Sequence, residues 1–289
     1  MKKFTSIQFN QILEYLYDLQ RLGIKVGLEH TEKLLFECGN PQDSFRSIHI
    51  AGTNGKGSTA AMLASIFREA GLRVGLYTSP HLIRFNERIR VNGLPISDDK
   101  IVEFVSEYKQ AIEDIRSTFF EATTALAFSH FAEEKADIAI IETGLGGRLD
   151  STNVLKPNVA IITSITSDHT EILGSDLKQI ASEKGGIIKL DTPLVLAEQT
   201  SDVGSVLKTI AQEKNAKIYE CKNSDVSDIT LIGNGTKFVW QGQGYVSGLI
   251  GKHQAYNAVL AIEATILFDN FIYCEKIKTG LLNTIWPGR

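Results

Sequence analysis

The stretch Ser47–Phe67, which reads SIHIAGTNGKGSTAAMLASIF, constrains the fold of this chain most strongly. It joins two hydrophobic runs through a short loop that holds three glycines, a lysine and hydroxyl side chains. A plain turn explains glycine and asparagine, but it does not need the lysine and the hydroxyls between a strand and a helix. The backbone N–H groups of such a loop and the N-terminus of the following helix form an anion site. We therefore predict that the loop binds the phosphates of a nucleotide, with a plain turn as the alternative.

The spacing within this loop departs from the standard phosphate-loop pattern of glycine, four residues and then Gly-Lys-Ser/Thr. The first two glycines are closer together here, and Gly57 separates Lys56 from Ser58. In the phosphate-binding interpretation, Lys56 neutralises the outer phosphates, and Ser58 or Thr59 faces a magnesium ion or a phosphate oxygen.

Short runs rich in β-branched residues alternate with segments of helical period between about residues 45 and 220. The predicted strands are 48–51, 74–78, 138–142, 159–165 and 194–197, and the predicted helices are 58–70, 100–116, 122–134 and 177–187. This alternation predicts an α/β fold with a doubly wound, mostly parallel sheet. From about residue 228 to 250, turn dipeptides between alternating apolar residues predict antiparallel strands appended to that sheet. A helix at 256–268 and another short helix are expected to follow.

Composition excludes several classes of protein. The net charge of −4 gives no electrostatic reason to expect a nucleic-acid partner, and no apolar run is long enough to cross a membrane. The N-terminus has neither the apolar run nor the cleavage site of a signal peptide and is typical of an amphipathic helix. The three cysteines are far apart and lack metal-ligand spacing. We expect a cytoplasmic protein with reduced thiols.

Polar residues follow two of the predicted strands at the carboxyl edge, where doubly wound sheets bind ligands. Glu142 ends one strand and could hold Mg²⁺, although a salt-bridged acid at a strand tip is an equal alternative. Asp168 and His169 follow another strand, and we favour a ligand role for His169 there. Lys184 falls late in the next helix, and its residue type alone predicts a solvated lysine.

Seven sequence blocks follow one another along the chain and together point to one protein family. They are HIAGTNGKGST, GLYTSPHLIRFNERIRVNG, FFEATTALAF, ETGLGGRLDSTNV, SITSDH with IASEKGGIIK, GKHQAYNA and WPGR. Together they resemble the folylpolyglutamate synthase/dihydrofolate synthase family of the ATP-dependent Mur ligases. The unusual loop spacing is the form found in that superfamily. The resemblance implies the fold of the Mur-ligase central domain. It also implies a reaction in which ATP converts a carboxylate into an acyl phosphate, which the amine of L-glutamate then attacks. The acceptor is dihydropteroate, tetrahydrofolate or its polyglutamates, and ATP and Mg²⁺ are the expected cofactors.

The resemblance also implies functional roles for individual residues. It places ATP at Thr53, Asn54, Gly55, Lys56, Gly57, Ser58, Asn257 and Arg289. It implies magnesium ligands at Ser79, Glu142, His169 and a carbamylated Lys184, and catalytic roles for Lys56, Lys184 and His169. The folate or pteroate site is implied at Ile24, Lys25, Val26, Phe119, Phe120, Glu121, Ala122, Leu149, Asp150 and Ser151. For Lys184, the resemblance replaces the expectation of a solvated side chain.

Members of this family carry a second α/β domain after the WPGR block. We therefore expect residues 1–285 to form an ATP-binding domain and residues 286–289 to begin the hinge to a ligase domain that this chain lacks. On that expectation the chain, as a monomer, binds nucleotide weakly and ligates poorly. The alternatives are an inactive nucleotide-binding paralogue, another Mur-type ligase, and a P-loop kinase or GTPase. The guanine signature Asn-Lys-x-Asp is not found, which weighs against a GTPase.

Overall fold

The computed structural model describes residues 4–23, 27–166 and 176–287. The functional predictions for Ile24, Lys25, Val26, His169 and Arg289 fall outside these ranges. Within the described ranges, no helix combines the length and the apolar character needed to cross a membrane.

The elements alternate along the chain as the sequence pattern predicts. The strands are β1 (Arg46–Ala51), β2 (Val74–Tyr77), β3 (Ile89–Val91), β4 (Leu94–Pro95), β5 (Ile138–Glu142), β6 (Val159–Ile162), β7 (Leu194–Ala197), β8 (Ile218–Cys221), β9 (Val226–Ile232), β10 (Gly235–Trp240) and β11 (Gln243–Ser247). The α-helices are α1 (Ser6–Asp18), α2 (Glu29–Glu37), α3 (Lys56–Glu69), α4 (Asp98–Ile115), α5 (Phe119–Glu133), α7 (Leu177–Gly185), α8 (Ser201–Glu213), α9 (Lys252–Phe268) and α10 (Cys274–Leu282). A short 3₁₀ helix, η4 (Ser151–Val154), follows β5.

In the described ranges, the main sheet has eight strands in the order β4-β3-β2-β5-β1-β6-β7-β8. The strands from β2 to β8 in this order pair in parallel, and β3 and β4 extend the β2 edge in antiparallel fashion. On β1, Ile48 lies opposite Ile140 of β5 and Val159 of β6. The predicted doubly wound, mostly parallel sheet is confirmed.

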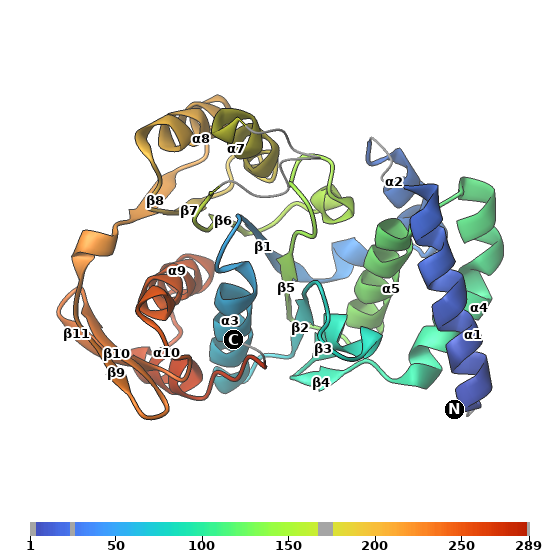
Figure 1. Cartoon of the computed structure of the whole chain (residues 1–289), viewed down its shortest axis with the longest axis horizontal. Coiled ribbons are helices and arrows are strands. Elements are labelled where there is room, and N and C mark those ends of the chain that lie inside the picture. The colour runs from blue at the N-terminus through green and yellow to red at the C-terminus, as the bar shows by residue number, and fades with distance from the viewer. Residues whose placement is uncertain (1–3, 24–26, 167–175, 288–289) are drawn as a thin grey trace.

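Both faces of the sheet are covered, because consecutive strand residues point to opposite sides. On β5, Ile138 and Ile140 belong to a core cluster with α3, α9 and α10. Ala139 and Ile141, which alternate with them, pack in a second cluster with α1, α2, α4 and α5. Helices α7 and α8 cover the β6–β7 part of that second face. Figure 1 shows the resulting three layers.

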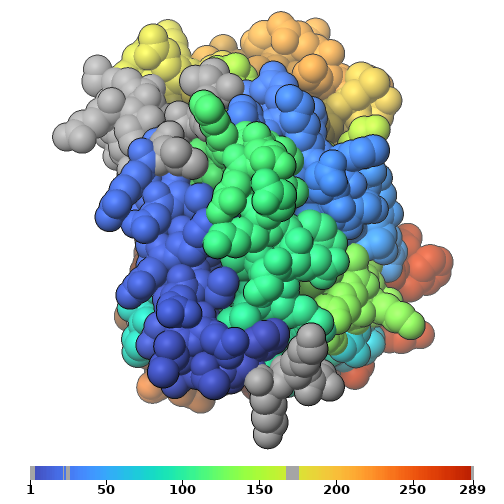
Figure 2. Space-filling view, turned by 90° about the vertical axis from the view of Figure 1, so that its right-hand side faces the viewer, coloured from blue at the N-terminus to red at the C-terminus, as the bar shows by residue number. Residues whose placement is uncertain are grey.

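Helices α1 and α4 lie in contact on the side of the molecule that Figure 2 shows, where α1 is dark blue and α4 is green. The ring of Tyr17 in α1 stacks on that of Phe119 in α5, with 5.8 Å between ring centroids. This contact brings the N-terminal helix against the start of α5.

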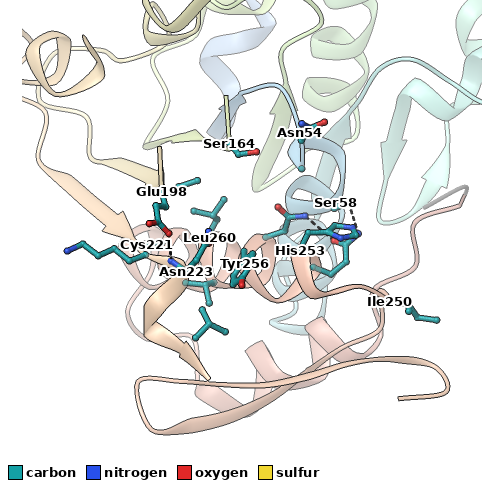
Figure 3. Close-up of a pocket in the computed structure, with 17 residues that line it drawn as sticks. Asn54, Ser58, Ser164, Glu198, Cys221, Asn223, Ile250, His253, Tyr256 and Leu260 are labelled. Atoms are coloured by element: carbon teal, nitrogen blue, oxygen red, sulfur yellow. Dashed lines mark hydrogen bonds between the residues drawn. The ribbon is translucent and has the colours of Figure 1, made fainter. Parts of the chain in front are cut away.

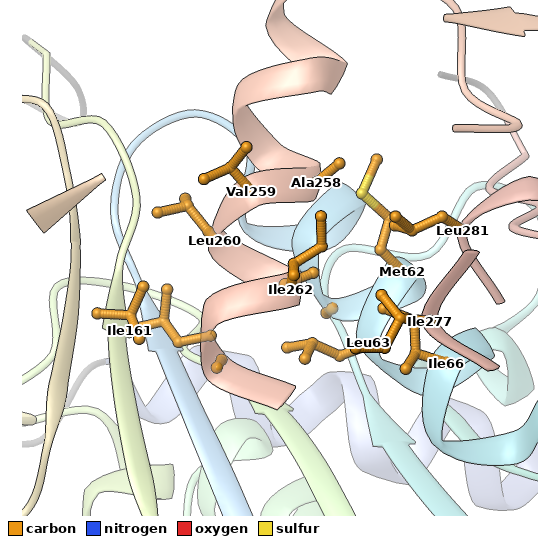
Figure 4. Packing of buried hydrophobic residues seen from close by; sticks show 14 of the residues in the cluster. Met62, Leu63, Ile66, Ile161, Ala258, Val259, Leu260, Ile262, Ile277 and Leu281 are labelled. Carbon is orange, nitrogen blue, oxygen red and sulfur yellow. The ribbon is translucent and has the colours of Figure 1, made fainter. Parts of the chain in front are cut away.

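Figure 4 shows part of the first core cluster, where buried side chains of α3, α9 and α10 lie together. The buried side chains gathered there are Met62, Leu63, Ile66, Ala258, Ile262, Ile277 and Leu281. Because α3 begins at Lys56, within the predicted phosphate loop, this packing holds one end of that loop in place.

Gly280 allows α10 to approach α3 closely. A Cβ atom at this position would lie 2.4 Å from Ile66 Cα and 2.8 Å from Ile66 N, and these backbone atoms cannot move without shifting α3. We expect Gly280→Ala to lower the free energy of unfolding by about 1–3 kcal/mol, as measured by urea denaturation. Gly204→Ala in α8 is the matched control, since the nearest atom to its Cβ is Gln199 Cβ at 3.9 Å. The control should be neutral or stabilising, because alanine favours helices. Equal stability of the two variants would contradict the close packing.

The predicted antiparallel strands at about 228–250 are confirmed, but the expectation that they extend the main sheet is wrong. Strands β9, β10 and β11 form a separate antiparallel sheet that packs against α9 and α10. Phe238 and Trp240, which alternate on β10, and Tyr245 on β11 are buried in the same cluster as these helices. Helices α9 and α10 therefore cover the apolar face of these strands. If the strands were instead added to the edge of the main sheet, these two helices would not cover that face.

Candidate active site

The predicted phosphate loop follows β1 and is held by the segment that follows β6. The backbone N–H groups of Thr53 and Asn54 both donate to the carbonyl oxygen of Ser164, at 2.9 and 3.2 Å. The Thr53 hydroxyl donates to the carbonyl oxygen of Thr166 at 3.1 Å. Helix α3 then begins at Lys56, so the free N–H groups of its first turn point toward the mouth of the loop.

Each glycine of the loop has a neighbour that excludes a side chain. A Cβ on Gly52 would lie 1.9 Å from Thr163 Oγ1, and a Cβ on Gly55 would lie 2.3 Å from Asn257 Oδ1. Gly55 also has a φ of +92°, which favours glycine. A Cβ on Gly57 would lie 2.9 Å from Cζ2 of the Trp286 indole. The additional glycine between the lysine and the serine is thus explained by an indole that packs on the first turn of α3.

We expect Gly57→Ala to weaken nucleotide binding about tenfold, because the methyl group must displace either Trp286 or the start of α3. Titration calorimetry with Mg²⁺-ATP measures this change. Gly244→Ala is the matched control, since no atom lies within 4 Å of its Cβ position, and it should bind as the unaltered chain does. Unchanged affinity in Gly57→Ala would show that the indole contact does not shape the loop.

The two lysines of the predicted site meet at one backbone carbonyl. Lys56 Nζ donates to the carbonyl oxygens of Gly52 and Thr53, at 3.1 and 3.4 Å. Lys184 Nζ donates to the same Gly52 oxygen at 2.8 Å. Two lysine side chains from distant parts of the chain are thereby held at the phosphate loop.

The expectation of a solvated Lys184, based on residue type, is wrong, because only 2% of this residue is exposed. It lies late in α7, as predicted, but the loop after β5 covers this end of the helix. Arg148 N donates to the carbonyl oxygen of Glu183 at 2.7 Å, and the Arg148 guanidinium pairs with the Glu183 carboxylate at 2.8 Å. A Cβ on Gly147 would lie 2.7 Å from the Glu183 carbonyl oxygen. Gly147 therefore permits a close approach of the loop to α7.

Glu142 and Ser79 lie together at the carboxyl ends of the adjacent strands β5 and β2. The Ser79 N–H donates to Glu142 Oε2 at 3.2 Å, and the glutamate is 4% exposed. A carboxylate and a hydroxyl are hard-oxygen ligands of the kind that Mg²⁺ prefers, so the donor set fits the predicted magnesium site. In the described part of the chain, no three His, Cys, Asp or Glu side chains gather as a metal site.

A cavity of about 700 Å³ opens beside the phosphate loop, a size typical of small-ligand sites. Figure 3 shows side chains from the loop, from α9 and from the ends of β7 and β8 around it. Its lining residues include the predicted nucleotide contacts Asn54, Gly55, Ser58 and Asn257.

Sequence reasoning missed several residues of this cavity. Gln254 donates to the Ser58 hydroxyl at 3.4 Å and accepts from Asn257 Nδ2 at 3.1 Å, so it joins the loop to α9. Two amide side chains three positions apart on one helix, which places them on the same face, were the available signal. Cys221 also lines the cavity, and burial raises the pKa of its thiol to about 12. The thiol therefore stays protonated at neutral pH and is a poor nucleophile.

The predicted folate segments at the start of α5 and around η4 are brought together. The Ser151 hydroxyl donates to the Phe120 carbonyl oxygen at 3.3 Å. Phe120 is 37% exposed, whereas Phe119 and Ala122 are buried in the core. Glu121 is buried and accepts from Thr118 N at 2.6 Å as part of a capping box that begins α5. Phe120 is thus the side chain of this segment that reaches the surface.

Asp150, another predicted folate residue, holds the loop in which it lies. Its carboxylate accepts from the backbone N–H groups of Gly144 and Leu145, at 2.8 and 2.9 Å, and from that of Thr152 at 3.0 Å. Burial raises the pKa of Asp150, and these hydrogen bonds oppose the shift. The structure therefore gives this carboxylate a structural role in the loop that follows Glu142.

Comparison with known proteins agrees with this geometry. Residues 50–265 match the family model described as the Mur ligase middle domain. A dihydrofolate synthase/folylpolyglutamate synthase of Bacillus subtilis is 39% identical over an alignment of 303 positions. The alignment covers 99% of this chain and 70% of that protein. An FPGS-AMPPCP-folate complex superposes with a TM-score of 0.91 at 33% identity, over 97% of this chain and 73% of that chain. Folylpolyglutamate synthase of Mycobacterium tuberculosis, complexed with ADP and AMPPCP, superposes with a TM-score of 0.89 at 34% identity. The superposition covers 98% of this chain and 67% of that chain.

Proposed function

Because this chain belongs to the folylpolyglutamate synthase/dihydrofolate synthase family of Mur ligases, we propose that it is an ATP-dependent ligase that adds L-glutamate to dihydropteroate, tetrahydrofolate or both. The observation that carries this proposal is the gathering of charged groups at one edge of the sheet. Lys56 and Lys184 meet at the Gly52 carbonyl after β1. Glu142 and Ser79 lie at the neighbouring strand ends. Within this proposal, residues 1–285 form the ATP-binding domain.

The reaction requires two anions to meet. An oxygen of the acceptor carboxylate attacks the γ-phosphorus of ATP, and the bond from that phosphorus to the bridging oxygen of ADP breaks. The amine of glutamate then attacks the carbonyl carbon of the acyl phosphate and loses a proton to solvent as inorganic phosphate leaves. Charge neutralisation and positioning supply most of the catalysis in such a transfer. We assign the neutralising role to Lys56, whose ammonium group lies at the loop.

The nucleotide is assigned to the phosphate loop and the cavity beside it. The backbone of Thr53–Ser58 provides N–H donors for the phosphates, and Asn257 lines the cavity together with Gln254. Arg289 is assigned to the nucleotide by its position in the WPGR block.

Ser79, Glu142, His169 and Lys184 are the proposed magnesium ligands. A bound magnesium ion would offset the negative charge of the phosphates. Carbamylation would give Lys184 the required charge: its neutral amine adds to carbon dioxide, loses one proton and becomes an anionic carbamate. The N–H that remains on Nζ can still donate to the Gly52 carbonyl oxygen, which lies 2.8 Å away. Lys184 is buried, so the charge of a carbamate there would have to be offset by the bound magnesium ion and not by water.

We assign the acceptor to the surface near Phe120 and the loop 149–151. The phenyl ring of Phe120 is the exposed apolar group of its segment and suits an aromatic substrate. Gly144 borders this surface, since a Cβ there would lie 3.6 Å from Ser79 Oγ and 3.7 Å from Phe120 Cε1. The acceptor would then lie next to the proposed magnesium ligands.

Mass spectrometry of the products tests this proposal. The chain is incubated with Mg²⁺-ATP and L-glutamate, and with 7,8-dihydropteroate or tetrahydrofolate in parallel reactions. Growth of either acceptor by one glutamyl unit is the expected result, and the parallel reactions show which acceptor is preferred. ATP binding without growth of either acceptor would contradict the ligase assignment and favour a nucleotide-binding paralogue.

A further inference from the structure

We propose that His49 is a positioning residue for the acceptor side of the site, acting through Thr152 and Asp150. This inference rests on the proposed function. It concerns the loop 143–150 between β5 and η4, named here the β5–η4 loop.

His49 begins a chain of buried hydrogen bonds that runs from β1 to this loop. It is fully buried, and its Nε2 atom lies 2.8 Å from Thr152 Oγ1. The Thr152 hydroxyl donates to Asp150 Oδ1 in a short hydrogen bond. Because that hydroxyl has one proton and gives it to the carboxylate, it must accept from His49. Nε2 of His49 therefore carries a proton. Burial, with a smaller contribution from the charge of Lys189, lowers the pKa of His49 to about 3, so the ring is neutral at pH 7.

Asp150 passes this restraint to the two ends of the β5–η4 loop. Its second oxygen accepts from the N–H groups of Gly144 and Leu145, just after the strand that ends in Glu142. Its first oxygen also accepts from Thr152 N at the start of η4. The loop thus closes around one carboxylate, and the orientation of that carboxylate depends on the hydroxyl that His49 supports.

His49 lies on β1, the strand that leads into the phosphate loop, so the hydrogen bonds to Thr152 and Asp150 also affect the position of the nucleotide relative to the acceptor. Three residues further along the same strand and loop lies Gly52, whose carbonyl oxygen receives both lysines. The hydrogen-bond chain therefore connects the strand that carries the phosphate loop with the loop that borders Phe120. Relative placement of the two reactants is what such a link would control.

The strand neighbours of His49 do not require a polar side chain at this position. Its register partners, Ile141 on β5 and Ala160 on β6, are both apolar. Among the described residues, Nδ1 of His49 is also buried without a hydrogen-bond partner. A buried polar atom of this kind destabilises the fold. The hydrogen bond from Nε2 to Thr152 is the contact that explains why a histidine is kept here despite the cost of the buried Nδ1 atom.

Thr152→Val tests the link, because it keeps the shape of the side chain and removes the hydroxyl. We expect KM for the acceptor to rise about tenfold or more, while the dissociation constant for Mg²⁺-ATP stays within about twofold. His49→Leu should behave in the same way. Thr152→Ser keeps the hydroxyl, and His49→Gln keeps an amide donor, so both should retain most of the acceptor affinity. Thr265→Val, which removes another buried hydroxyl bonded at 2.8 Å to the Ala261 carbonyl, controls for lost stability.

Three outcomes are distinguished. An unchanged acceptor KM in Thr152→Val, or an equal loss in Thr265→Val, overturns the positioning role and leaves the ligase proposal intact. No binding of either acceptor by the unaltered chain overturns both proposals. If the substituted chains fail to fold, ¹⁵N NMR of the unaltered chain decides: the expected signature is a neutral His49 protonated on Nε2, and protonation on Nδ1 alone overturns the inference.

Discussion

Replacement of Lys184 by methionine is expected to lower the rate of glutamate ligation by at least about a hundredfold. Methionine keeps the volume of the aliphatic stem and removes the nitrogen that lies 2.8 Å from the Gly52 carbonyl oxygen. The variant keeps the Lys56 amine at the phosphate loop but lacks the Lys184 amine, which is the nitrogen that carbon dioxide would convert to a carbamate. Single-turnover kinetics with saturating ATP and acceptor measure the loss in the chemical steps.

Lys178→Met is the matched control for this variant. Lys178 lies on the same helix, α7, but its side chain is exposed and pairs with Asp202 at 3.8 Å. We expect this control to ligate at the rate of the unaltered chain. A Lys184→Met variant that retained that rate would show that the buried lysine has only a structural role.

Lowering the carbon dioxide concentration tests whether Lys184 acts as a carbamate or as a free amine. If Lys184 acts as a carbamate, the unaltered chain should lose activity in buffer depleted of carbon dioxide and recover it when bicarbonate is added. The Lys184→Met variant should show no such response. Full activity of the unaltered chain under depletion would refute carbamylation and leave the amine as the acting group.

Substitution of Lys56 by alanine is the second change with a large expected effect. The ammonium group bridges the Gly52 and Thr53 carbonyl oxygens of the phosphate loop. Its loss removes the neutralising charge at the point where phosphates are expected to bind. We expect the rate to fall by about two to three orders of magnitude and the affinity for ATP to fall by about tenfold or more. Steady-state kinetics with varied ATP and calorimetric titration measure the two effects.

Lys237→Ala on β10 controls for the change in net charge, because this residue is exposed and belongs to the separate three-stranded sheet. Lys56→Arg tests geometry instead of charge. The guanidinium group is larger and planar, so we expect only partial activity where the ammonium group spans two carbonyls. Normal ATP affinity in Lys56→Ala would contradict the assignment of this loop to phosphates.

The parallel sheet and the loop that joins β1 to α3 were predictable because both depend on local patterns. Continuous apolar runs identified β1 and β5, and Glu142 ends its strand as expected. The resemblance to a known ligase family was also visible in the ordered blocks of the sequence. Strands β3 and β4 were missed, since segments of three and two residues are too short to show a period.

The environment of individual side chains was harder to predict from local patterns. Lys184 is buried because the backbone of Arg148, 36 positions away in the chain, docks on its helix. Periodicity predicted strands β9 to β11, but alternation does not reveal whether helices or a larger sheet will cover the apolar face. The pairing of His49 with Thr152 likewise depends on two segments that meet only in the folded chain.

Formation of an acyl phosphate is the central chemical claim, and transfer of an oxygen label tests it most directly. Dihydropteroate carrying ¹⁸O in both carboxylate oxygens is incubated with the chain, Mg²⁺-ATP and L-glutamate, and the released phosphate is examined by ³¹P NMR. The account predicts that each phosphate released carries one ¹⁸O atom, because the acceptor carboxylate attacks the γ-phosphorus. Glutamylated product accompanied by unlabelled phosphate would contradict it.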